Sequence, residues 1–156
     1  CSSYSKNFGL YSERVGCLIY HSKNMNNYSS VQSNFKKVAR TIYSNPPSHG
    51  SDIVKTILSD QNLKSLWEIN LSEAKNRIIN MRKSLVENLV KENCSRDFEF
   101  IINQKGMFSF TGLSSDEVNQ LKEKFSIYIV NSGRINVAGV TSKNVNYIAK
   151  AISSVI

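Results

Sequence analysis

Apolar side chains recur at steps of three and four residues along several stretches of the chain, which places them on one face of an α-helix. The first stretch predicts a helix that ends near Ser44–Asn45, because Pro46 disfavours helical geometry in the residue before it. Pro47 suits the start of a second helix. The apolar positions of these two helices are Val31, Phe35, Val38, Ile42, Ile53, Val54, Ile57 and Leu58.

A third helix is predicted from about residue 66 to about residue 90, roughly twice the mean helix length. Charged residues such as Arg82 lie mostly off its apolar stripe. A helix this long in a small chain often links two lobes, and we place the boundary between them after residue 66. The apolar stripe consists of Ala74, Ile78, Met81, Leu85 and Leu89.

Short apolar runs in the rest of the chain predict strands, at residues 17–20, 98–102, 107–110, 127–130 and 135–138. Lys105–Gly106 would connect two of these strands in a hairpin-like turn, and residues 131–133 would connect the last two. The polar residues 22–30 are predicted to form a loop or the start of a helix.

Two hydroxyl residues mark helix starts in the last third of the chain. Ser114 begins a capping box, in which its hydroxyl accepts from the backbone of Glu117 while the Glu117 carboxylate reaches back. Thr141 is expected to cap the last helix. Residues 95–156 are therefore predicted to form a small α+β unit behind the long helix.

The composition is that of a folded globular chain. Hydrophobic residues make up 40% of the 156 residues and charged residues 21%, which suffices for a core. No apolar run approaches the roughly 18 residues that a membrane span requires, so we expect no membrane association. The first residues lack the pattern of a signal peptide and include no initiator Met, so we expect the chain to begin within a longer protein.

The net charge of +8 would suit a polyanionic partner, but the lysines are scattered and no basic run is interleaved with aromatic residues. We therefore expect no nucleic-acid binding and keep a non-enzymatic basic binding module as a distant alternative. The three cysteines are far apart, and the two histidines have no metal-ligand spacing to them. This pattern predicts reduced thiols in an intracellular protein and no metal site.

The strongest local motif spans residues 3–16 and reads SYSKNFGLYSERVG. Small residues flank Lys6, and an arginine, Arg14, follows eight residues later. Small neighbours leave room for a flat ring, and an arginine offers a planar fork to a dianionic phosphate. An amine that attacks an aldehyde must be neutral, which favours a desolvated and cationic site. A single lysine is usually a solvated surface group. The interpretation of Lys6 as a lysine that reacts with an aldehyde therefore depends on the whole pattern.

This motif resembles the cofactor-attachment motif of the class I pyridoxal-phosphate-dependent aminotransferases. The resemblance implies that Lys6 holds pyridoxal 5'-phosphate covalently and moves a proton between the substrate α-carbon and the cofactor. It also implies that Ser3, Ser5 and Arg14 bind the cofactor phosphate.

A second segment, residues 40–50, reads RTIYSNPPSHG and resembles the part of aspartate aminotransferases that crosses to the other subunit. The resemblance implies a homodimer in which Arg40 binds the side-chain carboxylate of a dicarboxylic substrate in the neighbouring active site, with Ser44 close by. The residues alone leave another interpretation open, in which Arg40 extends its charged end from a helix surface into water.

Two further segments resemble the same family. Residues 132–137 read SGRINV, and by this resemblance Arg134 binds the substrate α-carboxylate bidentately, while the preceding glycine lets the backbone turn and the substrate approach. Residues 106–110 read GMFSF, and Phe108 would form a wall of the substrate pocket. A core aromatic in a strand is an equally good interpretation of Phe108.

The use of arginine supports these assignments without any family. The chain has 14 lysines and 6 arginines, and Arg14, Arg40 and Arg134 each fall within a motif. Bidentate recognition of a carboxylate or phosphate requires Arg, because the Lys ammonium is a point charge.

The motifs cover nearly the whole chain in the order of the family, and they imply the α/β fold of the fold-type I pyridoxal-phosphate transferases. Residues 1–66 would then be the remainder of the large cofactor-binding domain. Residues 67–156 would be the long linking helix and the small α+β domain.

The resemblance is closest to the aspartate aminotransferases. It implies ping-pong transfer of the amino group between aspartate or glutamate and the keto acids 2-oxoglutarate or oxaloacetate. An aromatic or broad-specificity class I aminotransferase is the alternative. The 156 residues alone are expected to be inactive, because the family's acidic partner of the cofactor ring nitrogen is not among them. The sequence favours a cytoplasmic location and leaves a mitochondrial one open.

Overall fold

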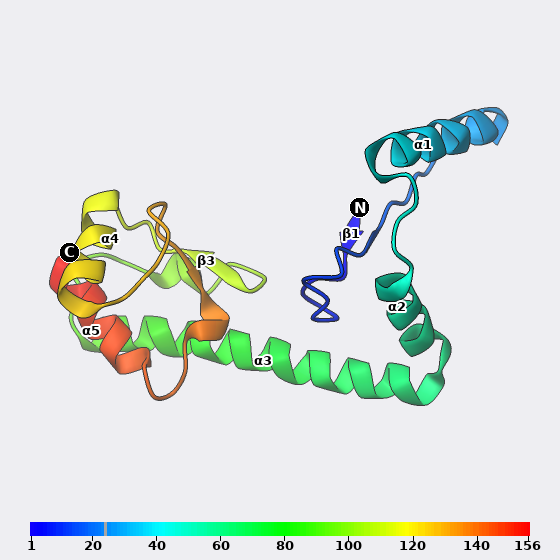
Figure 1. Cartoon of the computed structure of the whole chain (residues 1–156). Coiled ribbons are helices and arrows are strands. Elements are labelled where there is room, and N and C mark those ends of the chain that lie inside the picture. The colour runs from blue at the N-terminus through cyan, green and yellow to red at the C-terminus, as the bar shows by residue number, and fades with distance from the viewer. Residues whose placement is uncertain (24) are drawn as a thin grey trace. The chain divides into compact units, whose positions relative to one another are not determined.

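The computed structural model describes residues 1–23 and 25–156, and this part of the chain divides into two compact units, Cys1–Leu71 and Ser72–Ile156. Both units are mostly helical (Figure 1). Asn24, within the polar stretch predicted at 22–30, lies outside the described residues. The division of a whole enzyme into domains after residue 66 stays a prediction.

The first unit opens with a closed loop. β1 (Ser2–Ser3) pairs antiparallel with β2 (Gly16–Cys17), so that the twelve residues between them form the loop. The strand predicted at 17–20 is wrong beyond Cys17, since residues 18–20 lie outside the ladder and are exposed. An apolar run predicts a strand only where a neighbouring strand is available to pair with it.

Two amphipathic helices follow the loop. After the 3₁₀-helix η1 (Met25–Asn27), α1 runs over Tyr28–Tyr43 and ends just before Ser44, as the following prolines predict. α2 (His49–Ser59) starts two residues later than Pro47 suggested. None of the described residues of α1 is buried, and Ile42 on its apolar stripe is 70% exposed. The apolar stripe of α1 is therefore largely exposed in the described chain, although the Phe35 ring meets Tyr20 at 5.9 Å between centroids.

α3 (Gln61–Lys91) is the predicted long helix, extended by five residues at its start. Asp60 caps it, because its Oδ1 accepts from the backbone N–H groups of Asn62 and Leu63 at 2.8 and 2.9 Å. Leu85 and Leu89 are buried, as the stripe predicted. Arg82 is buried as well, at 3% exposure, although the pattern placed it mostly off the stripe.

The second unit contains an antiparallel ladder of β3 (Phe108–Phe110) and β4 (Arg134–Asn136), with Phe110 opposite Arg134 and Phe108 opposite Asn136. The hairpin predicted around Lys105–Gly106 is therefore wrong, because β3 pairs with a strand more than twenty residues later.

Two other predicted strands in this unit are also wrong. Residues 98–102 contain a 3₁₀-helix, η2 (Glu99–Ile101), in which Phe98 and Ile101 are buried at a spacing of three rather than two. Residues 127–130 have no strand geometry. The strand predicted at 107–110 is confirmed over 108–110 as β3. The last predicted strand forms in part, as β4, before the chain turns into the 3₁₀-helix η3 (Val137–Gly139).

The helices of the second unit pack on the core. In α4 (Ser115–Phe125) the predicted capping box is confirmed: Ser114 Oγ accepts from Glu117 N, and a Glu117 carboxylate oxygen accepts from Ser114 N. Thr141 does not cap α5 (Val145–Val155), whose N-cap is Asn144. The largest fully buried apolar side chains of this unit are Leu85, Leu89, Ile101, Leu121, Val137 and Ile152.

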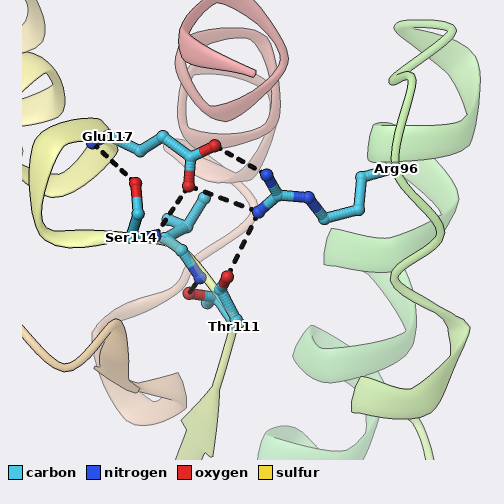
Figure 2. Close-up of polar contacts among 6 residues, drawn as sticks. Arg96, Thr111, Ser114 and Glu117 are labelled. Atoms are coloured by element: carbon cyan, nitrogen blue, oxygen red, sulfur yellow. Dashed lines mark hydrogen bonds and ion pairs between the residues drawn. The ribbon is translucent and has the colours of Figure 1, made fainter.

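Arg96 extends the capping box into a wider network (Figure 2). Its guanidinium bonds both carboxylate oxygens of Glu117, at 2.6 and 3.3 Å, and donates to the Gly112 carbonyl at 3.2 Å. The Glu117 carboxylate thus serves two positive partners, the Arg96 guanidinium and the helix N-terminus. The segment after α3 is thereby joined to the start of α4.

Candidate functional site

The closed loop between β1 and β2, together with β1, gathers four of the residues singled out in the sequence. Tyr4 N donates to Val15 O at 3.2 Å next to the ladder, and Phe8 N and Leu10 N both donate to Tyr4 O. Gly9 turns the chain with a φ of +69°, which a residue without a side chain adopts easily. Ser5, Lys6 and Arg14 therefore lie on one compact loop, and Ser3 lies in β1 immediately before it.

The polar groups of this loop suit an anion. Ser3 Oγ donates to Ser5 Oγ at 3.1 Å and accepts from Ser5 N at 3.3 Å, so the two hydroxyls lie side by side. The exposed Arg14 donates one guanidinium N–H to Tyr11 O at 2.9 Å. A guanidinium carries five N–H donors, so several can still bind an anion. Two hydroxyls and a guanidinium on one loop form a donor set that fits a phosphate group.

Lys6 lies at the surface of the same loop. Its Nζ is 3.8 Å from the centroid of the Tyr11 ring, which is a cation–π contact. The side chain is exposed in the described chain. The desolvation expected of an imine-forming lysine therefore has to come from whatever binds over the loop.

Trp67, in the first half of α3, holds the backbone next to Lys6. Its ring stacks on Phe8 at 4.6 Å between centroids, and its Nε1 donates to Asn7 O at 2.8 Å. Phe8 in turn meets the edge of Tyr4 at 5.3 Å. These contacts lie on both sides of Lys6 in sequence, so they restrict how its backbone can move.

α2 supports the other side of the loop. His49 Nδ1 lies 2.9 Å from Glu13 Oε2, and this hydrogen bond to the carboxylate raises the pKa of His49 above its ordinary value. A Cβ on the buried Gly50 would lie 2.9 Å from Glu13 Cβ and 3.1 Å from Val15 Cβ, so only glycine lets α2 pack this closely. The residues on either side of Arg14 are thereby fixed.

Arg40 and Ser44 form a second group, at the end of α1. Ser44 N donates to Arg40 O at 3.0 Å, and Ser44 has a φ of +62° that turns the chain out of the helix. Both residues are exposed. The Arg40 guanidinium is therefore available to a carboxylate from outside the described chain.

Phe108 and Arg134 form a third group, on the ladder of the second unit. The Arg134 guanidinium carbon lies 4.9 Å from the centroid of the Phe108 ring, diagonally across the two strands. Phe108 is 36% exposed, which excludes the interpretation of a buried core aromatic. An arginine that lies against an aromatic ring can bind the carboxylate of a flat ligand.

The residue before Arg134 has a constrained backbone. Gly133 has a φ of +72°, and a Cβ there would lie 2.9 Å from Leu113 O. Its carbonyl accepts from Thr111 N at 3.0 Å and from Thr111 Oγ1 at 2.8 Å. The buried Thr111 therefore fixes the start of the strand that carries Arg134. Sequence reasoning missed Thr111, because nothing in its local pattern distinguishes it from other strand threonines.

The family pattern described as aminotransferase class I and II matches residues 1–152. The chain belongs to this family. Among curated aminotransferases, the aspartate aminotransferase of Haemophilus influenzae is 47% identical over 155 residues, which is 99% of this chain and 39% of that protein. The mitochondrial aspartate aminotransferase of Dictyostelium discoideum is 42% identical over 155 residues, 99% of this chain and 36% of that protein. The chain thus spans about two fifths of the length of these relatives.

The fold of the aminotransferase family is confirmed by a solved structure. The aromatic-amino-acid aminotransferase of Burkholderia pseudomallei, described as covalently bound to pyridoxal phosphate, matches with a TM-score of 0.90. It is 47% identical, and the match covers 99% of this chain and 39% of that one. The α/β fold of the fold-type I transferases, predicted from the motifs, is therefore correct for this chain.

Among the described residues, no three His, Cys, Asp or Glu side chains come together in a way that could hold a metal ion. In the same part of the chain, no helix is long and apolar enough to cross a membrane.

Proposed function

We propose that this chain is part of an aspartate aminotransferase that carries pyridoxal 5'-phosphate on Lys6. The observation that carries the proposal is the closed loop, which presents Lys6 together with Ser3, Ser5 and Arg14. The curated relatives of similar sequence support the choice of reaction, since they are named aspartate aminotransferases.

The chemistry divides between the cofactor and the chain. Ser3, Ser5 and Arg14 would hold the cofactor phosphate, and the Lys6 amine would hold its aldehyde carbon covalently, with water as the leaving group. When bound, the cofactor supplies an electron sink for the bond that breaks at the substrate α-carbon. Lys6 would move a proton between the substrate α-carbon and the cofactor. The expected order is ping-pong: the first amino acid would leave as its keto acid, and a second keto acid would then receive the amino group.

The substrate is held by its two carboxylates. Arg134 binds the α-carboxylate with the Phe108 ring beside it, and Arg40 binds the side-chain carboxylate of aspartate or glutamate with Ser44 nearby. A substrate held by both carboxylates would lose less entropy at the reaction step, because its α-carbon would already be oriented.

We also propose that Arg40 acts in the active site of a second subunit of a homodimer. The largely exposed apolar stripe of α1 supports this, because Phe35, Val38 and Ile42 are at least 41% exposed on the helix that carries Arg40 in its last turn. A second copy of the chain would cover that stripe. Light scattering of the natural-length protein should give twice the mass of one chain, and a monomer that turns over aspartate would refute the arrangement.

Lys6 is tested by trapping its bond to the cofactor. The natural-length protein is reduced with borohydride and digested, and mass spectrometry should find the cofactor on Lys6. Lys6→Ala should lose the label and slow turnover by about a thousandfold, since it removes the group that transfers the proton. Lys55→Ala, at an exposed position of α2, is the matched control and should keep both. A label on any other lysine contradicts the central assignment.

Specificity for dicarboxylic substrates is tested at Arg40. Because one similar structure is that of an aromatic-amino-acid aminotransferase, an aminotransferase of broader specificity remains the alternative. Arg40→Gln should lower kcat/KM for aspartate by about ten- to a hundredfold, because a charge-assisted hydrogen bond is lost, and should change turnover of phenylalanine little. Lys37→Gln removes the same charge from an exposed position of α1 and should have no such effect. Unchanged aspartate turnover in Arg40→Gln would favour the alternative.

We propose a cytoplasmic location. All three cysteines are free, and a similar protein from Saccharomyces cerevisiae is described as cytoplasmic, while another relative is mitochondrial. Fractionation of the source cells with an antibody to this chain tests the proposal, and recovery in an organelle fraction would overturn it.

A further inference from the structure

Arg82 is a buried cation whose partners are not carboxylates. It is 3% exposed, its Nε donates to Ser109 Oγ at 3.1 Å, and its second guanidinium nitrogen donates to Gly106 O at 2.7 Å. Burial lowers its pKa below the ordinary arginine value. Removing a guanidinium from water is costly, and an apolar side chain would fill the same space without that cost. Compared with an apolar side chain, Arg82 adds directional hydrogen bonds to the segment that contains β3.

Arg77 makes a matching set of bonds to the segment after β4. It precedes Arg82 on α3, and its guanidinium donates to Ala138 O at 3.1 Å and to Val140 O at 3.0 Å. Because the strands are antiparallel, the residues before β3 and after β4 lie at the same end of the ladder. Both arginines therefore attach that end of the ladder to α3.

The faces of the ladder show why this attachment concerns the candidate site. Phe108, Phe110 and Arg134 alternate to the exposed face, whereas Ser109 and Ile135 between them are buried. Arg82 binds Ser109 from the buried face. Side chains of adjacent strand residues point to opposite faces, so holding Ser109 fixes the pleat that turns Phe108 outward. The ladder transmits the same constraint to Arg134, opposite Phe110.

We propose that Arg82, with Arg77, is a positioning residue that sets the place of Arg134 and Phe108 through the backbone of the β3–β4 ladder. The proposal rests on the proposed function, in which Arg134 binds the substrate α-carboxylate. Arg82 itself touches neither substrate nor cofactor. A shift of the ladder by a fraction of an ångström would displace the Arg134 guanidinium, which binds the substrate carboxylate. A displacement of about 1 Å can cost a hundredfold in rate.

The test is a double-mutant cycle in the natural-length protein loaded with pyridoxal 5'-phosphate. Arg82→Met removes the donors and keeps most of the volume, and it is expected to lower kcat/KM for aspartate by about tenfold or more, mainly through KM. Arg134→Lys removes the fork itself. If Arg82 acts through Arg134, the change at position 82 should have little further effect once Arg134 is lysine.

Two matched variants test whether the effect of Arg82→Met comes from lost positioning, and not from the lost charge or from a failure to fold. Lys83→Met, at the exposed next position of α3, removes one positive charge and should leave kcat/KM unchanged. Ser109→Ala removes only the partner of the Arg82 Nε, and it should raise KM in the same direction as Arg82→Met, again only when Arg134 is present. This second variant decides the question if Arg82→Met fails to fold.

The outcomes distinguish the two proposals. If Arg134→Lys leaves turnover of aspartate unchanged, the proposed role of Arg134 fails, and the positioning role fails with it. If Arg134→Lys impairs turnover but Arg82→Met or Ser109→Ala lowers kcat/KM equally in both backgrounds, only the positioning role is overturned. An unchanged KM in a folded Arg82→Met protein also overturns it.

Discussion

At the scale of single residues, the chain uses arginine where a forked donor is needed. Three of its six arginines lie in the motifs, and the structure gives the other three, Arg77, Arg82 and Arg96, two or more acceptors each. A lysine ammonium cannot reach two acceptors with fixed planar geometry. In a chain with 14 lysines, the position of every arginine is therefore informative. Arg82 lies outside every local motif, so its role could not be predicted from the sequence alone.

Gly133 offers a test at this scale. Gly133→Ala should destabilise the protein by about 1–2 kcal/mol or more, because alanine is disfavoured at positive φ and its Cβ would press on Leu113 O. Gly139→Ala is the control, since a Cβ there meets nothing within 4 Å. Urea denaturation measures both. Equal midpoints for the two variants would show that the Gly133 backbone relaxes without cost.

At the scale of elements, local signals predicted helices well and strands poorly. The capping box at Ser114 and Glu117 was correct because both partners lie within one helical turn. The strand at 98–102 and the hairpin at Lys105–Gly106 were wrong, because strand pairing depends on residues far away in the chain. Thr141 was also a wrong cap, since Asn144 three residues later takes the position.

Glu117 provides a prediction for the start of α4. The Arg96 hydrogen bond, helped by the bonds from Ser114, lowers the pKa of Glu117 below its ordinary value. A lowered pKa in the folded state means that the carboxylate adds stability above the unfolded pKa of about 4.3 and loses it as pH falls through the folded value. Glu117→Gln should therefore cost about 1 kcal/mol at pH 7 and less at pH 3.

The measurement is denaturant unfolding of both proteins at the two pH values. Glu123→Gln removes the same charge from an exposed position of α4 and should show no difference at either pH. A cost for Glu117→Gln that is as large at pH 3 as at pH 7 would mean that the lost stability does not come from the charged carboxylate.

At the scale of the whole molecule, the apolar core is unevenly distributed. The buried core cluster lies between Leu85 and Val155, in the second unit. In the described part of the first unit, Val54 is the one buried apolar side chain, while α1 exposes its stripe. A unit with so little burial cannot offset the conformational entropy of its own folding.

This distribution predicts how the 156 residues behave when produced alone. We expect no transaminase activity, rapid proteolysis within residues 1–71, and protection of the region between Leu85 and Val155. Hydrogen exchange followed by mass spectrometry measures the difference directly. Uniform protection with cofactor binding and turnover of aspartate would refute the expectation that the chain needs further polypeptide.

The sequence by itself determined the helices, the loop motif around Lys6 and the family. These depend on periodicity and on residues within one short stretch, where the chain supplies both partners of each interaction.

Only the tertiary structure decided which distant residues meet. The pairing of β3 with β4, the burial of Arg82 and the seating of Gly133 against Leu113 each join segments about twenty or more residues apart. Such contacts are selected by how α3, α4 and α5 pack around one core, and no local pattern encodes that choice. Lys6 could therefore be found from its neighbours in sequence, whereas the support for Arg134 became visible only in three dimensions.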